Sequence, residues 1–459
     1  MAQTRTEMVM DTITGRIAAR SLSAGARLPS VRAMARSQQV SVSTVVEAYN
    51  RLAAEGAIRA RPGSGFYVAD QLAPMALAAM GPRLEMEIDP FWVSRQSLVA
   101  QDARPKPGCG WLPPSWLPEA SLRRALRKLA RAEASVFSEY GTPLGLAGLR
   151  QLIARRLAER GVPAAPDRIV LTESGTQAID LVCRLLLEPG DTVLVDDPCY
   201  FNFQALLRAH RVRIVGVPHR PDGPDLAAFE AVLGAERPRL YITNCAIHNP
   251  TGATLSPAVA HRVLKLADAH GMTIVEDDIF ADFETTPAPR LAGLDGLERV
   301  VQIGSFSKTL SAAARCGFIA ARADWIEGLV DLKIATAFGG GRLNEELVLA
   351  ALSDGAFRTA TEAMRARLAT ARDRAIARLE AMGLVPWHHP AAGMFVWCRM
   401  PEGIESGALA RRALDRDIVL APGNVFSVSR AAGRFMRFNV SQMEDEAVLG
   451  ALEGLLAEG

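Results

Sequence analysis

Ser305-Phe306-Ser307-Lys308 follows the apolar run 300–304, and Arg315 stands seven residues beyond the lysine. A lysine between hydroxyl side chains means little alone. With a predicted strand before it and an arginine about two helical turns after it, the stretch is typical of a buried lysine that forms a Schiff base. We therefore predict that Lys308 holds pyridoxal phosphate.

Length and composition indicate the class of protein to which such a site belongs. The 459 residues exceed one ordinary domain by a factor of about two or three, and contents of 49% hydrophobic and 22% charged residues are typical of soluble globular proteins. The six cysteines form no CxxC pair, and neither a signal peptide nor an apolar run of about 18 residues is evident. These features predict a cytoplasmic protein without a membrane span.

A basic patch lies at the amino end, although the whole chain carries a net charge of only +2. Residues 1–70 contain nine arginines, no lysine and five acidic residues, which gives a local charge of +4. Arginine side chains suit phosphate groups, so a nucleic-acid function would have to reside in this segment.

The pattern of this segment is more specific than its charge. Residues 8–19 show helical apolar spacing, Ser30 is a candidate N-cap of a short helix, and residues 43–52 form a second amphipathic helix that stops near Gly56. Residues 58–68 then indicate a hairpin with a proline and two glycines at its tip. The expected structure is a helix-turn-helix followed by a wing.

Over residues 5–69 the segment resembles the winged helix of the GntR family. The residues that carry the resemblance are Leu28, Pro29, Ser30, Val31, Arg32, Val40, Ser41, Ser43, Thr44, Val45, Ala48, Tyr49, Leu52, Gly63, Ser64 and Gly65. The resemblance implies that the second helix enters the major groove of double-stranded DNA while the wing grips the backbone or minor groove. The predicted DNA-binding residues are Arg32, Ser41, Ser43, Thr44, Arg59, Arg61 and Gly65. The plainer alternative is a small helical dimerisation module with solvated arginines.

The remaining chain divides into a predicted linker, residues 71–108, and a large domain, residues 109–459. The linker is rich in small apolar residues and prolines. In the domain, apolar runs alternate with helical stretches, which predicts an α/β fold with a largely parallel sheet covered on both faces. The expected strands are 168–172, 192–195, 212–217, 240–244, 273–276, 300–303 and 317–320. After about residue 330, a long helix (356–382) and two later strands (394–399 and 435–440) predict a smaller α+β lobe.

Polar residues follow several of the predicted strands, at the edge where open α/β sheets bind ligands. Ser174, Gly175 and Thr176 open a helix whose N–H groups suit a phosphate, although simple helix capping explains them as well. Tyr200 can stack on a planar cofactor or belong to the core. Asn249 lies in an Asn-Pro-Thr-Gly turn and can donate to a phenolic oxygen, or the turn can be an ordinary one.

Glu276, Asp277 and Asp278 end a further predicted strand. One of these carboxylates can pair with a protonated pyridine nitrogen, which maintains the ring as an electron sink. Alternatively, acids at the end of a strand bind solvent or cap a helix.

Together, over residues 110–455, these segments resemble fold type I pyridoxal-phosphate enzymes of the aspartate aminotransferase superfamily. The resemblance implies a large mostly parallel sheet lobe and a small α+β lobe. It implies that Lys308 forms the Schiff base, that Asp277, Asn249 and Tyr200 contact the ring, and that the phosphate is held by Ser174, Gly175, Thr176, Ser305 and Arg315. Tyr140 would reach the phosphate of a neighbouring subunit, which implies a homodimer. Arg437 would bind the α-carboxylate of a substrate.

One position departs from the family pattern. The family often has a tyrosine two or three residues after the strand-end aspartate, where it donates to the ring hydroxyl, whereas this chain has Ile279 and Phe280. Loss of that donor removes stabilisation from the phenolate, so we predict a raised imine pKa. Catalytic turnover is therefore a weaker expectation than cofactor binding.

A winged helix joined to such a domain resembles the MocR subfamily of GntR-type regulators. The resemblance implies a transcriptional regulator that binds a DNA operator and senses an amine, an amino acid or pyridoxal phosphate itself. Two alternatives stay open: a working aminotransferase of amino acids, in which Lys308 shuttles a proton, and a DNA-binding scaffold with an inert domain. The histidines show no metal-ligand spacing, so we predict no metal site.

Overall fold

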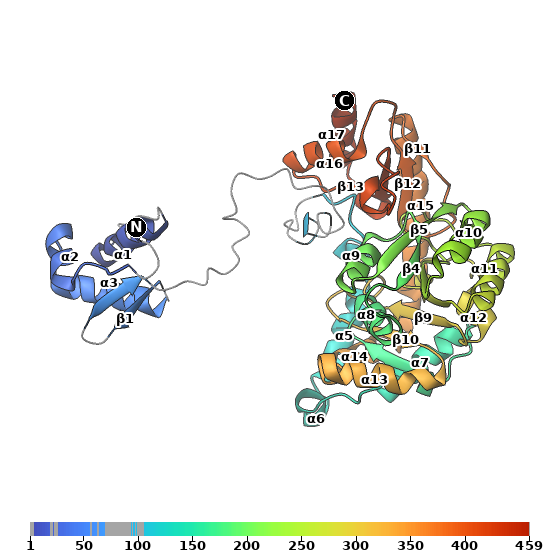
Figure 1. The fold of residues 1–459 in the computed structure, drawn as a ribbon, viewed down its shortest axis with the longest axis horizontal. Coiled ribbons are helices and arrows are strands. Elements are labelled where there is room, and N and C mark those ends of the chain that lie inside the picture. The colour runs from blue at the N-terminus through green and yellow to red at the C-terminus, as the bar shows by residue number, and fades with distance from the viewer. Residues whose placement is uncertain are drawn as a thin grey trace. The chain divides into compact units, whose positions relative to one another are not determined.

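The computed structural model describes residues 4–18, 22, 26–55, 57–61, 64–68, 93, 95, 96, 98 and 105–458. The chain divides into two compact units, Met1–Met86 and Glu87–Gly459 (Figure 1). Most of the predicted linker lies outside the described residues. Its last four residues, 105–108, belong to the second unit and are hydrogen-bonded to its later segments, since Gly108 N donates to Val419 O at 2.8 Å and Asn439 N donates to Pro107 O at 2.7 Å. No helix in these ranges is long and apolar enough to cross a membrane.

The first unit is a winged helix. Its elements are α1 (Arg5–Ala18), α2 (Val31–Gln38), α3 (Val42–Ala54), β1 (Ile58–Arg61) and β2 (Gly65–Val68). Ser30 caps α2 by accepting from Ala33 N, and Ser41 caps α3 by accepting from Thr44 N. The buried ring of Tyr49 fixes the turn before α2, because its hydroxyl donates to Pro29 O at 2.9 Å.

The second unit is built on an eight-stranded sheet with the order β3-β10-β9-β8-β7-β4-β5-β6. The strands are β3 (Ile169–Thr172), β4 (Thr192–Asp197), β5 (Arg213–Arg220), β6 (Gly223–Pro224), β7 (Leu240–Thr243), β8 (Thr273–Asp277), β9 (Val300–Ser305) and β10 (Gly317–Ala320). The central strands run parallel, while β10 and β6 pair antiparallel with their neighbours. All seven strands predicted for this lobe form, with small differences at their ends.

Helices cover both faces of this sheet, so alternate residues of one strand enter different cores. On β7, Tyr241 packs into a core with α7, α10, α11, α12 and α14, whereas Leu240 and Ile242 pack into a core with α8, α9 and α13. The bounds are α7 (Ala147–Ala158), α8 (Gly175–Leu186), α9 (Phe201–Ala209), α10 (Leu226–Glu236), α11 (Pro257–Ala269), α12 (Leu291–Asp295), α13 (Ala323–Ala337) and α14 (Arg342–Leu352). Two further helices, α5 (Glu119–Leu129) and α6 (Ala134–Ser138), precede α7.

The small lobe contains an antiparallel sheet with the order β11-β12-β14-β13, which packs with long α15 (Figure 1). Its elements are α15 (Gly355–Ala381), β11 (Val385–Pro386), β12 (Phe395–Arg399), α16 (Ser406–Asp415), β13 (Ala421–Pro422), β14 (Phe435–Asn439) and α17 (Glu446–Ala457). Residues 112–116 join this core although they lie far away in sequence, since Leu112 and Trp116 are buried in it. The expected α/β architecture with a large and a small lobe is confirmed.

Candidate functional site

Lys308 lies in the connection between β9 and β10, which pair antiparallel with Ser305 opposite Gly317. Phe306 N donates to Cys316 O at 3.1 Å and closes the base of this connection. The pairing brings the start and the end of the Ser305–Arg315 stretch together.

The amine of Lys308 is enclosed by protein on several sides. Gly110 borders it: a methyl group placed on Gly110 would lie 3.8 Å from Lys308 Nζ and 3.9 Å from Arg437 Nη2. Burial lowers the pKa of Lys308 to about 8, and the nearby Arg437 guanidinium also acts to lower it. The folded protein therefore holds a lysine that loses its proton more readily than an ordinary lysine side chain, as a nucleophilic amine requires.

An anion cradle forms where the first turn of α8 meets the end of β9. The two segments approach closely, because a Cβ added to Gly175 would lie 3.8 Å from the Ser305 Cβ. A Cβ added to Gly317 would lie only 3.0 Å from Gly175 N, so Gly317 also borders the start of α8. Ser305 Oγ lies 2.9 Å from Ser307 Oγ, and Ser174 caps the helix by accepting from Gln177 N at 3.1 Å. A helix N-terminus with hydroxyl groups beside it is a site for a phosphate.

Thr176 and Arg315 are exposed beside this cradle. Asn202 Nδ2 donates to Thr176 Oγ1 at 3.4 Å, which links the hydroxyl to α9. Arg315 adopts a left-handed conformation with φ of 42° two residues before β10 begins. Both groups can close on an anion from the solvent side.

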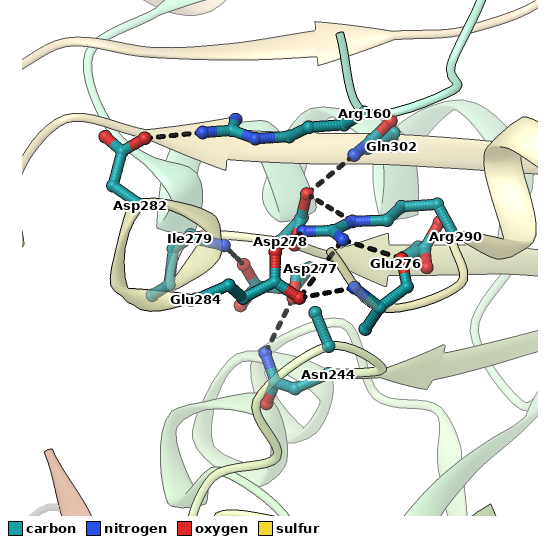
Figure 2. Close-up of polar contacts among 12 residues, drawn as sticks. Arg160, Asn244, Glu276, Asp277, Asp278, Ile279, Asp282, Glu284, Arg290 and Gln302 are labelled. Carbon is teal, nitrogen blue, oxygen red and sulfur yellow. Dashed lines mark hydrogen bonds and ion pairs between the residues drawn. The ribbon is translucent and has the colours of Figure 1, made fainter. Parts of the chain in front are cut away.

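Asp277 ends β8 with a buried carboxyl group (Figure 2). Ile279 N donates to its Oδ1 at 3.2 Å, and Asn244 Nδ2 donates to its main-chain oxygen at 3.0 Å. Burial raises the pKa of Asp277 to about 7. Among the described residues no arginine, lysine or histidine forms an ion pair with this carboxyl group, so it suits a cationic ring nitrogen.

Arg437 is 1% exposed on β14 and has no carboxylate partner within the described part of the chain. Its Nη1 donates to Asn249 Oδ1 at 2.8 Å, its Nη2 donates to Gly108 O at 2.6 Å, and its Nε is buried without a partner. The guanidinium lies 4.3 Å from the ring centroid of Phe395 and 4.7 Å from that of Phe426. A buried, uncompensated arginine of this kind is a strong site for a carboxylate.

The two predicted tyrosines lie in different environments. Tyr200 is half-buried at the start of α9, and its ring lies 4.9 Å from that of Phe201. Tyr140 is 77% exposed, and its ring meets the exposed ring of Phe338 edge-on at 5.0 Å. The single chain therefore leaves Tyr140 at its surface rather than in the site of Lys308.

Neither residue at the expected tyrosine position carries a hydroxyl donor, and the structure gives each another role. Phe280 is 2% exposed and packs edge-on against Phe395 at 5.4 Å in the small-lobe core. The Cγ2 atom of Ile279 would lie 3.4 Å from a Cβ on Gly175, so it borders the anion cradle.

The predicted DNA-binding residues lie on the surface of the winged helix. Arg32, Ser41 and Ser43 are exposed, and Thr44 is half-buried. The Ser41 oxygen also lies 2.8 Å from Ser43 Oγ and 2.7 Å from Thr44 Oγ1, so part of its bonding capacity serves the cap of α3. Arg59 is exposed on β1 and Gly65 has φ of 108° at the start of β2. The side chain of Arg61 lies outside the described residues.

The sequence did not single out residues 108–110, which lie beside Lys308 and Arg437. Asn439 Nδ2 donates to Cys109 O at 3.2 Å, and the buried Cys109 thiol lies close enough to both cations to influence their pKa values. Residues 108–110 show no periodic pattern in the sequence. Nothing in the sequence therefore indicated a contact across more than 300 residues, such as that between Gly108 and Arg437.

Asp196, His219 and His248 gather at the end of β4 although their spacing in sequence shows no metal pattern. The two imidazole rings stack with centroids 3.9 Å apart and an interplanar angle of 14°. Asp196 already accepts from Tyr241 at 2.6 Å and from Thr243 at 2.7 Å, so the cluster has a structural explanation.

Family models match both units. Residues 115–455 match the family described as aminotransferase class I and II, and residues 5–68 match bacterial regulatory proteins of the gntR family.

Similar proteins combine the same two parts or share the larger one. Over 92% of its length, the chain is 30% identical to an uncharacterized HTH-type transcriptional regulator, YdcR, of Escherichia coli, of which 93% is covered. It is 32% identical to 2-aminoadipate transaminase of Thermus thermophilus over 76% of this chain and 90% of that protein. It is 25% identical to the HTH-type transcriptional regulator NorG of Staphylococcus aureus over 87% of this chain and 92% of that regulator.

A solved structure agrees with these matches. LysN, an α-aminoadipate aminotransferase of Thermus thermophilus in complex with N-(5'-phosphopyridoxyl)-L-leucine, has a TM-score of 0.72 at 28% identity and covers 79% of this chain and 96% of its own. Pyridoxal phosphate is the cofactor that this fold implies. The chain therefore belongs to the HTH-type transcriptional regulators of MocR-like architecture, in which a gntR-type domain is fused to an aminotransferase class I and II domain.

Proposed function

We propose that this protein is a transcriptional regulator whose aminotransferase-like domain binds pyridoxal phosphate at Lys308 and senses a carboxylate-bearing amine. The observation that carries the proposal is the position of two cations around Gly110. A Cβ added to Gly110 would lie 3.8 Å from Lys308 Nζ and 3.9 Å from Arg437 Nη2, so these two nitrogen atoms lie close to each other beside Gly110. One amino acid can therefore reach the cofactor lysine with its amine and Arg437 with its carboxylate.

The residues present fit the cofactor. Lys308 supplies an enclosed amine for covalent attachment, and Asp277 supplies a buried carboxylate without a cationic partner among the described residues. Asn249 would donate its Nδ2 to the ring hydroxyl, and its Oδ1 already accepts from Arg437. Tyr200 would lie against the ring. When bound, pyridoxal phosphate supplies an electron sink for charge that develops on an amine substrate.

The phosphate would be held by groups that the fold gathers at one place. These are Ser174, Gly175, Thr176, Ser305 and Arg315. The first three open α8, Ser305 ends β9, and Arg315 precedes β10. Backbone N–H groups and one arginine together compensate the phosphate charge.

The winged helix would bind a DNA operator through α3 and the wing. Arg32, Ser41, Ser43, Thr44, Arg59, Arg61 and Gly65 remain the residues that we assign to this contact. A protein that recognises operators in this way acts in the cytoplasm. All six cysteines are free and buried, which is consistent with a reducing compartment.

The position of Tyr140 supports the proposal of a homodimer with shared sites. Two buried residues hold the loop that carries it, since Lys333 Nζ donates to Pro143 O and Glu345 Oε2 accepts from Leu146 N, both at 2.8 Å. The loop is thus fixed while the Tyr140 ring is exposed, which suits a contact with the phosphate site of a second copy.

Sensing and DNA binding would be coupled through the small lobe, because Arg437 lies on its strand β14. An amine that engages Lys308 and Arg437 together would shift this lobe and change the geometry of the dimer. The coupling must be reciprocal, so operator DNA would change the affinity for the amine by the same factor.

DNA titrations with the full chain test this proposal. The probe is a duplex that covers the region upstream of the chain's own gene, and titrations are run without cofactor, with pyridoxal phosphate, and with pyridoxal phosphate plus single amino acids. We expect at least one amino acid to change the affinity about fivefold or more, which corresponds to typical coupling energies. Identical affinities throughout contradict sensing, and absence of a visible absorbance band with pyridoxal phosphate indicates an inert domain.

An amino-acid aminotransferase is the second candidate. The observation that favours it is the 32% identity to a transaminase, together with a lysine whose pKa of about 8 suits proton transfer. Rapid conversion of the bound cofactor to its amine form by amino acids, without sequence-specific DNA binding, would support this candidate over regulation.

A further inference from the structure

A buried network of acidic residues surrounds Arg290 directly behind Asp277 (Figure 2). Arg290 is 2% exposed, and it lies between Asp278 and Glu284, which are 8% and 7% exposed. Glu276 and Asp277 are buried as well. Two of these four buried carboxyl groups, those of Asp278 and Glu284, pair with Arg290.

Arg290 uses every N–H group that a guanidinium offers. Its Nε and Nη2 donate to the two oxygens of Asp278 at 3.2 and 3.1 Å. Its Nη1 donates to Glu284 Oε1 at 3.1 Å and to Ala288 O at 2.8 Å, and Nη2 also donates to Glu284 Oε2. The guanidinium therefore ties the end of β8 to the connection that leads to α12.

The alternation of side chains along a strand gives this network a consequence for Asp277. Glu276 and Asp278 point to one face of the sheet, and Asp277 points to the other. Glu276 accepts from Leu291 N at 2.9 Å and from Ala292 N at 2.8 Å, next to Arg290 in the chain. Residues 290–292 thus hold both neighbours of Asp277 from the face opposite to Lys308.

Two further bonds complete the position of Asp278. Its backbone N donates to Ile303 O at 2.9 Å, which extends the pairing with β9, and its Oδ2 accepts from Gln302 Nε2 at 2.9 Å. The next residue, Ile279, donates its backbone N–H to the Asp277 carboxylate at 3.2 Å. Any movement of Asp278 therefore moves the group that orients Asp277.

We propose that Arg290 is a positioning residue that directs the Asp277 carboxylate toward the ring nitrogen of pyridoxal phosphate by binding Asp278 and Glu284 from behind. The inference rests on the proposed binding of the cofactor at Lys308. The planar fork of arginine is required, because a lysine has three donors from one atom and cannot bind both carboxylates in two-pronged fashion.

Two substitutions of the full chain test the role of this fork. In Arg290→Met the charge and all five donors are lost, whereas Arg290→Lys keeps the charge and loses the fork. Arg299→Met and Arg299→Lys are matched controls, because Arg299 also pairs with an aspartate, Asp268 at 2.8 Å, but on the surface. The probe is pyridoxal phosphate, and affinity is measured by titration of its visible absorbance band.

We expect both Arg290 variants to bind pyridoxal phosphate about tenfold more weakly or worse, and both Arg299 variants to stay within about twofold of the wild type. The pH midpoint of the visible band should rise in Arg290→Met by about half a pH unit or more, since unpaired carboxylates favour protonated groups nearby. It should change little in Arg290→Lys, which keeps the charge.

A merely structural role would lower the unfolding temperature of the cofactor-free variants without changing cofactor affinity or the pH midpoint. Folded Arg290 variants that bind within twofold of the wild type therefore overturn the inference. If Arg290→Met does not fold, the affinity of Arg290→Lys for pyridoxal phosphate tests the inference by the same twofold limit. A wild-type protein without the visible band overturns the proposed cofactor site itself, which distinguishes the two failures.

Discussion

The winged helix and the cofactor site use arginine in opposite ways. In the winged helix, Arg32 and Arg59 are exposed and can meet phosphates without leaving water. In the second unit, Arg290 and Arg437 are almost fully buried; Arg290 is paired on every donor, whereas Arg437 has no carboxylate partner in the described ranges. Exposed charges share the work of binding DNA and are individually replaceable, whereas a buried charge determines what the site can bind.

Replacement of Lys308 by alanine should have the largest effect. Lys308→Ala removes the amine that we propose as the covalent attachment point of the cofactor, so we expect complete loss of the visible absorbance band. An exposed lysine of α11, Lys265, provides the control, and Lys265→Ala should keep the wild-type spectrum. A Lys308→Ala protein with an unchanged visible band would show that another lysine is the attachment site.

Asp277→Asn should weaken the binding of pyridoxal phosphate about a hundredfold but stabilise the cofactor-free protein. Burial raises the pKa of Asp277 to about 7 from 3.8, so the folded state disfavours the carboxylate and stability falls as pH rises between these values. Because one pKa unit corresponds to about 1.4 kcal/mol, removal of the charge should add on the order of 2–4 kcal/mol at pH 8 and little at pH 4. Thermal unfolding of the wild type and of Asp277→Asn at both pH values measures this gain in stability. An equal gain at pH 4 and pH 8 would contradict the burial of the Asp277 carboxylate.

Arg437→Met should leave cofactor binding intact and weaken the binding of amino acids about 10- to 100-fold. This is the effect expected for the loss of a charge-assisted hydrogen bond to a carboxylate. The corresponding amines without a carboxylate should be affected much less. Arg434, exposed just before β14, gives the control substitution Arg434→Met. Spectral titration with each amino acid and its decarboxylated counterpart measures the difference, and equal losses for both would refute the role of Arg437.

Arg32→Ala should weaken DNA binding only severalfold and lower the slope of log affinity against log salt by about one per protomer. Arg51→Ala is the control, because Arg51 already pairs with Glu47 at 2.8 Å on α3. Affinities at several salt concentrations measure the slope. A loss of DNA affinity as large as the loss of ligand affinity expected for a buried arginine would contradict the difference between the two units.

The smallest effect concerns the linkage between Lys308 and the bound cofactor. Phe280 packs in the core and Ile279 borders the cradle, so neither donates to the ring hydroxyl as a tyrosine would. We expect the pKa of the linkage to lie about one unit above that of an ordinary aminotransferase. A spectroscopic pH titration of the wild type decides this, and an ordinary value would refute the prediction.

Local patterns in the sequence accounted for the elements and for most residues proposed at the site. Apolar runs marked the strands, because both faces of a parallel sheet must be buried, and polar residues directly after them marked the binding edge. Lys308, Asn249 and the first turn of α8 each follow a strand, and Glu276, Asp277 and Asp278 stand at the end of another. This rule marked the segments, whereas the choice of Asp277 among the three acids came from the resemblance to a family. Arg437 required the resemblance to a family, since an arginine within a strand has no local signature.

What the sequence determined by itself is the identity of the two units and the chemistry that each can perform, because helix caps, strand periodicity and the order of motifs are local properties. Only the tertiary structure decided that Gly110 borders both Lys308 and Arg437 and that Arg290 binds Asp278 and Glu284 behind Asp277. These contacts depend on how β8, β9 and β14 are placed in space. Pairing between distant residues leaves no trace in the spacing of a single sequence.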